Sequence, residues 1–77
     1  MKVKEVFQTN WLEFINQGFQ PSRKNIGEIT RCSDIYREHG FTYDSVCQLF
    51  SKWAGQDITA YLEEIFQEYD HNSELYA

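Results

Sequence analysis

Four side chains in the sequence could support nucleophilic or metal chemistry: Cys32, His39, Cys47 and His71. Their separations of seven, eight and 24 residues fit no usual zinc pattern, and the two cysteines form no CxxC pair. A nucleophilic site also needs a cysteine beside a histidine and an orienting acid, and nothing local supplies that arrangement. We therefore expect no enzyme, no metal and no cofactor, and two reduced thiols packed as small hydrophobic groups.

Carboxylates dominate the end of the sequence. Lys52 is the last Lys or Arg, and six acids follow it without a compensating base: Asp57, Glu63, Glu64, Glu68, Asp70 and Glu74. On a helix, Glu64 and Glu68 are like charges one turn apart, and the later acids crowd a helix end whose partial charge is already negative. This pattern is typical either of a solvated acidic face that aids solubility or of an interface for a basic partner.

The spacing of these acids suggests one kind of partner. Carboxylates four residues apart on a helix lie about 6 Å apart along its axis, on the scale of successive phosphates in one nucleic-acid strand. The leading hypothesis is a non-enzymatic inhibitor of a basic, nucleic-acid-handling protein, for which anti-CRISPR and antirestriction proteins are an analogy of type. Its candidate partner-binding residues are the acids Asp57, Glu63, Glu64, Glu68 and Asp70, with Tyr61 and Tyr69 as anchors at the rim.

Charge and hydropathy argue against two other classes of partner. A net charge of −5 disfavours direct binding to nucleic acid or to an anionic membrane, since both depend on Lys and Arg. A helix-turn-helix interpretation of residues 43–66 fails because the second helix would carry no base to meet phosphate. No apolar run is long enough to span a bilayer, and the first residues lack the apolar centre of a signal peptide, so we expect a cytoplasmic protein.

Two apolar residues support an alternative function. Leu12 and Ile35 fall off the apolar faces of their expected helices, where they would contact a second molecule. The alternative is therefore a small structural or regulatory module that forms a homodimer through apolar surface. In that case the acidic residues serve only solubility.

Residues 41–69 are the stretch in which all local signals agree. Thr42 is placed to cap a first helix, Gly55 to end it, and Asp57 to cap a second helix. Apolar residues recur at helical spacing in both segments: Val46, Leu49, Phe50 and Trp53 in the first, and Ile58, Tyr61, Leu62, Ile65, Phe66 and Tyr69 in the second. The two segments predict a helical hairpin around Gly55.

Local signals conflict in the first half of the chain. Residues 3–17 fit one amphipathic helix closed by Gly18, but Asn10 and Glu13 resemble a capping box that would start a shorter helix and leave residues 2–7 as a strand. Helix is favoured, because a lone strand has nothing to pair with.

Residues 23–39 also leave alternatives open. Ser22 is a candidate cap, and an apolar stripe runs along this segment, but Gly27 sits inside it. A second helix starting near Ser33 and a strand at residues 26–30 both stay open. The predicted fold is all-α: a small compact bundle of three to four short helices, in a single domain spanning residues 1–77 with 72–77 frayed.

Overall fold

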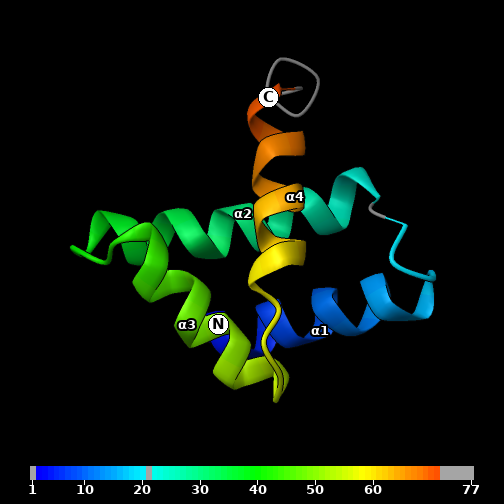
Figure 1. Cartoon of the computed structure of the whole chain (residues 1–77), viewed down its shortest axis with the longest axis horizontal. Helices are drawn as coiled ribbons and strands as arrows, with labels where there is room; N and C mark the ends of the chain where they lie inside the picture. Colours follow the sequence, from blue (N-terminus) through cyan, green and yellow to red (C-terminus); the bar gives the residue numbers. More distant parts are fainter. Residues whose placement is uncertain (1, 21, 72–77) are drawn as a thin grey trace.

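Four helices make up the fold of the computed structural model, which describes residues 2–20 and 22–71, with backbone alone at 69–71 (Figure 1). They are α1 (Val3–Asn16), α2 (Arg23–Glu38), α3 (Tyr43–Ala54) and α4 (Thr59–His71). No strand occurs among the described residues, so the all-α prediction is confirmed. The predicted fraying of residues 72–77 lies outside the described part of the chain.

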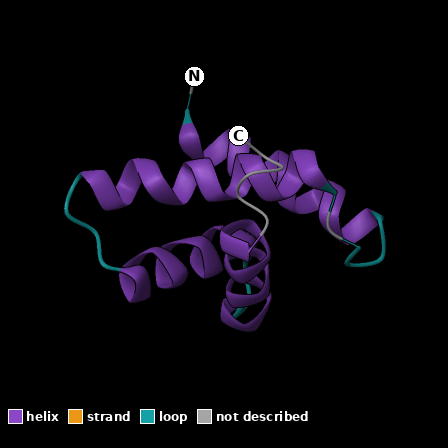
Figure 2. Cartoon of the chain, turned by 90° about the horizontal axis from the view of Figure 1, so that it is seen from above, coloured by secondary structure: helices purple, strands orange, loops and turns teal. Residues whose placement is uncertain are grey.

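The helices pack as a pair and a hairpin. Helices α1 and α2 run antiparallel and side by side, with a turn at residues 17–19 after α1, while α3 turns back at Gly55 into α4 (Figure 1). Figure 2 views α4 end-on, with α2 lying across it. Helix α4 therefore crosses α2 instead of lying along it, and it contacts both α2 and α3.

The predicted N-terminal caps of α2 and α3 are confirmed. The Ser22 hydroxyl accepts the Asn25 backbone N–H at 3.2 Å, and the Thr42 hydroxyl accepts the Ser45 backbone N–H at 3.1 Å. Each cap satisfies one of the N–H groups that have no partner in the first helical turn.

Glycines end the first three helices, as the sequence predicts for Gly18 and Gly55. Gly18, Gly40 and Gly55 have φ angles of 70°, 94° and 79°, in the left-handed region where a side chain is costly. The residue after each glycine donates its N–H to a carbonyl five residues earlier, at 3.1 to 3.2 Å. This hydrogen bond defines the Schellman motif, which satisfies carbonyls of the last helical turn.

Aromatic pairs reinforce two of these helix ends. Phe19 packs edge-on against Phe14 at the end of α1, with ring centroids 5.5 Å apart, and Phe41 packs against Tyr36 at the end of α2 at 5.0 Å. In both cases the residue after the glycine contacts the residue whose carbonyl it binds, which is the hydrophobic contact that accompanies the motif. The α1–α2 and α2–α3 turns are therefore held by side chains as well as by backbone.

Aromatic rings fill the centre of the core. Phe7 of α1 is fully buried and lies 4.3 Å from the ring of Phe50 on α3, with Trp11 and Trp53 also in ring contact. Buried apolar residues come from all four helices: Phe7, Trp11, Phe14, Ile26, Ile29, Cys32, Val46, Cys47, Phe50, Ile58, Leu62, Ile65 and Phe66. Large rings give this short chain the buried area that its length makes scarce.

Helix α1 runs without a break through Asn10, so the strand alternative for residues 2–7 is excluded. Asn10 and Glu13 do not cap a helix; both accept hydrogen bonds from the side-chain amide of Asn25 on α2, at 2.9 and 2.8 Å. The Asn10 amide in turn donates to the Val6 carbonyl at 2.9 Å, and the Ser22 hydroxyl donates to the Asn25 side-chain oxygen at 2.6 Å. This buried network joins α1 to the start of α2.

Helix α2 is also continuous, from Arg23 to Glu38, so neither a separate helix at Ser33 nor a strand at residues 26–30 forms. Ser33 is buried within the helix at 3% exposure instead of capping a new one. The helix continues through Gly27 because burial of the apolar face of α2 outweighs the low helix propensity of one glycine.

Replacing Gly27 with alanine is expected to stabilise the protein. A Cβ atom at Gly27 meets no atom within 4 Å, so the substitution restricts the unfolded chain without a clash. Urea denaturation should show the free energy of unfolding rising by about 0.5–1 kcal/mol. Gly55→Ala, at a φ of 79°, is the contrasting variant and should lower it. A destabilised Gly27→Ala protein would contradict the described packing around α2.

Replacing Asn25 with aspartate is expected to destabilise the protein. The change keeps the shape of the side chain but removes both donated hydrogen bonds and sets a carboxylate against Glu13. The free energy of unfolding at neutral pH should fall by about 2–3 kcal/mol, since buried acceptors lose their donor. Gln48→Glu, the same chemical change on an exposed position of α3, should change it by less than about 0.5 kcal/mol. Equal losses of unfolding free energy in the two variants would argue against the hydrogen-bond network around Asn25.

Candidate partner-binding surface

Helix α4 is fixed by one buried face. Ile58, Leu62 and Ile65 are at most 2% exposed and Phe66 is 8% exposed, in contact with the common core. The entry to the helix is also bonded, because the Ile58 backbone N–H donates to the hydroxyl of Ser51 at 3.1 Å. The remaining faces of α4 are therefore held in defined positions.

Asp57, the predicted cap of α4, lies one position too early to be its N-cap, because the helix begins at Thr59 and Ile58 directly precedes it. Its carboxylate accepts the Thr59 backbone N–H at 3.1 Å. This hydrogen bond, which favours the charged form, lowers the pKa of the fully exposed Asp57 carboxyl. Asp57 therefore stays charged at neutral pH.

The candidate acids lie on the exposed surface where the structure describes them. Asp57, Glu63, Glu64 and Glu68 are all exposed. Tyr69 and Asp70 belong to the helical part of the backbone, but their side chains lie outside the described atoms, as does Glu74. The structure therefore describes four carboxylates of the predicted acidic face, and all four are exposed.

One flank of α4 faces helix α3. The Phe66 ring packs edge-on against Tyr43 at 5.6 Å. Burial raises the pKa of Tyr43 to about 12, with contributions from Cys47 and from the charges of Glu63 and Asp44. Burial also raises the pKa of the Cys47 thiol, against a hydrogen bond with Tyr43 that lowers it, and three carboxylates add to the rise: Glu63, Asp44 and Asp57. The charges of the three acids therefore all act on the same residue of α3, Cys47.

Asp44 is a member of this acidic surface that sequence reasoning missed. It is exposed in the first turn of α3, 13 positions before Asp57. An acid at this position is explained by its favourable interaction with the helix dipole. No pattern in the sequence marks Asp44 as part of this surface. The packing of Tyr43 against Phe66 brings α3 and α4 together only in the folded chain.

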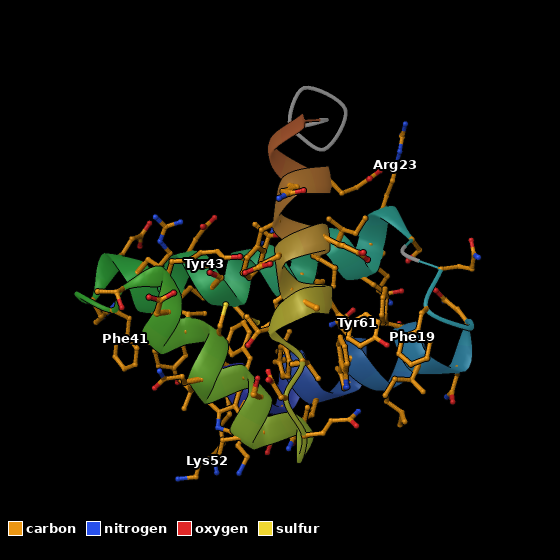
Figure 3. All side chains as sticks on the ribbon, viewed as in Figure 1. Phe19, Arg23, Phe41, Tyr43, Lys52 and Tyr61 are labelled. Atoms are coloured by element: carbon orange, nitrogen blue, oxygen red, sulfur yellow. The ribbon has the colours of Figure 1, made fainter. Side chains whose placement is uncertain are left out.

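The other flank of α4 carries Tyr61, which is 37% exposed. Its ring stacks on Phe19, from the turn between α1 and α2, with centroids 4.9 Å apart and planes inclined by 16°. Figure 3 shows Tyr61 and Phe19 next to each other, and the buried rings of Trp11 and Phe14 meet Tyr61 edge-on at 6.0 and 6.3 Å. The predicted rim anchor Tyr61 therefore has a partner, Phe19, that lies 42 positions away in the sequence.

The cysteines are packing residues. Cys32 and Cys47 are free thiols, each 2% exposed. Burial, with a contribution from Glu28, raises the pKa of Cys32 to about 11. Both thiols are therefore protonated at neutral pH, the form that is least nucleophilic. No group of three metal-binding side chains occurs within the described residues.

The two apolar residues singled out in the sequence are exposed, Leu12 by 58% and Ile35 by 37%. Ile35 borders a shallow hollow between α1 and α2 of about 100 Å³. Its lining is mainly apolar, with charged groups at two positions: Val3, Val6, Glu28, Arg31, Cys32 and Ile35.

Comparison with known proteins gives no match to a protein-family model, to a curated protein or to a solved structure. Over residues 2–20 and 22–71, none of the helices combines the length and the hydropathy that crossing a membrane requires.

The electrostatic arrangement predicts that two adjacent glutamates act differently on Cys47. Replacing Glu63 with glutamine should lower the pKa of Cys47, because it removes a negative charge that disfavours the thiolate. Replacing Glu64, on the other flank, should leave that pKa unchanged. The pKa of Cys47 in each variant can be measured from the ¹³Cβ chemical shift of Cys47 as a function of pH. Equal shifts in the two variants would show that α4 is not oriented as described.

Proposed function

We propose that the chain is a non-enzymatic protein-binding module that acts in the cytoplasm as an inhibitor of a basic, nucleic-acid-handling protein. The observation that supports this most is the combination of a helix fixed by its buried face with exposed carboxylates on both flanks, Glu63 on one and Glu64 on the other. No Lys or Arg follows Lys52 in the sequence, so any base near these two carboxylates belongs to an earlier part of the chain. Such a helix presents negative charge in fixed positions before any partner arrives.

Rigidity makes the charge useful for recognition. A partner that binds a preformed acidic surface avoids the entropy cost of ordering it, and complementary potentials accelerate encounter. Negative charge from three exposed acids, Asp44 of α3, Asp57 before α4 and Glu63 of α4, acts on one residue of α3, Cys47. This surface repels nucleic acid itself and attracts proteins whose surface is adapted to phosphate.

A second candidate function is supported by a separate observation. The exposed residues Leu12 and Ile35, with the hollow beside Ile35, would suit a small structural or regulatory module that forms a homodimer. Self-association through apolar surface should persist or strengthen as salt rises, whereas binding through α4 should weaken.

The inhibitor proposal predicts a salt-sensitive interaction that nucleic acid displaces. Tagged protein would be used to capture partners from a lysate, followed by elution with duplex DNA or RNA. We expect a captured protein to elute with nucleic acid, and its affinity to fall roughly tenfold between about 50 and 200 mM salt. A double variant, Glu63→Gln with Glu64→Gln, should lose that partner.

The matched control is Glu5→Gln with Glu38→Gln, which makes the same charge change at exposed positions of α1 and α2. It should keep the partner. Loss of binding in both double variants would indicate a general effect of net charge, and retention in both would refute the role of α4. Sedimentation of the native protein at the same salt concentrations tests the homodimer alternative, which predicts a dimer that persists as the salt concentration rises.

A further inference from the structure

Two stacked rings lie at the surface beside the acidic helix. Phe19 and Tyr61 are 42% and 37% exposed, and their rings are 4.9 Å apart and nearly parallel. Figure 3 shows the two side chains next to each other at the base of α4. Stacking hides one face of each ring, so the pair offers its outer face and ring edges to solvent, while the buried rings of Trp11 and Phe14 meet Tyr61 edge-on.

The backbone is strained to place Phe19 there. Among the described residues, Phe19 is the one non-glycine with a positive φ, at 62°, directly after Gly18 at 70°. A bulky residue in this region is an outlier, and such outliers concentrate at binding sites. Contacts with Phe14 and Tyr61 hold Phe19 in this conformation, while 42% of the residue stays exposed.

Negative charge lies next to the rings. Glu64 is three positions after Tyr61 on α4, which places the two side chains as neighbours on one face of the helix. Figure 3 shows the side chain of Arg23, near the start of α2, pointing away from the two rings. The surface thus combines aromatic faces with an adjacent carboxylate, the two groups that an arginine side chain binds best.

We propose that Phe19 and Tyr61 form a stacking site for an arginine side chain of the partner, with its guanidinium lying against the outer face of the ring pair and donating hydrogen bonds to Glu64. This inference rests on the proposed function and names the group that α4 recognises. Arginine fits better than lysine, because the planar guanidinium stacks on an aromatic face while it binds a carboxylate through two N–H groups. Proteins adapted to phosphate carry arginines at their binding surfaces for the same reason.

The test is calorimetric titration of the native protein, at low salt, with oligoarginine and oligolysine peptides of equal length. We expect oligoarginine to bind about threefold tighter or more, on the scale of a cation–π contact. Phe19→Leu and Tyr61→Leu should each abolish that preference. Phe41→Leu is the matched control, because Phe41 is 38% exposed and also follows a glycine at a helix end, and it should retain the preference. Circular dichroism would verify that each variant folds.

Three outcomes would overturn the inference in different ways. Equal binding of the two peptides, weakened by Glu63→Gln with Glu64→Gln but by neither ring variant, would refute the arginine site and leave the acidic surface intact. Binding of neither peptide would refute both the site and the proposed function. A preference for arginine that survives both ring variants would place the recognition elsewhere on the protein.

Discussion

Burial of one face of α4 is the constraint on which the rest of the surface depends. Ile58, Leu62, Ile65 and Phe66 complete the core formed by the other helices, and Ser51 accepts the backbone N–H at the entry to the helix. Removing a buried side chain of this size costs about 2–5 kcal/mol, a large share of the stability of a small domain. The helix therefore cannot leave its place without loss of the fold.

That constraint explains how an unfavourable charge pattern persists. Like charges one turn apart and acids near a helix C-terminus each cost a few tenths of a kcal/mol to about 1 kcal/mol, far less than the apolar contacts supply. The buried stripe also separates the carboxylates into two flanks, with Glu63 near Tyr43 and Cys47 and Glu64 on the side of Tyr61. Two adjacent residues in the sequence thus belong to different parts of the surface.

The elements that local signals specify could be predicted from the sequence, and those set by distant partners could not. Caps at Ser22 and Thr42 and left-handed glycines act within one turn, so their residue types sufficed. Asn10 and Glu13 suggested a false start for α1, because their true partner, Asn25, lies on another helix. The acids of α4 were visible as a run in sequence. Asp44 and Phe19 were not, since only the crossing of α3 with α4 and the stacking on Tyr61 bring them to the surface that α4 presents.

The central claim is that α4 is folded and fixed in the free protein, before any partner binds. Amide hydrogen exchange measures this directly. The account predicts that the N–H groups of Leu62, Ile65 and Phe66 exchange only in the global unfolding event, at rates close to those of Phe7 and Ile29 in the centre of the core. Rapid exchange along α4 while α1 to α3 stay protected would contradict it, because the carboxylates of α4 would then have no fixed positions.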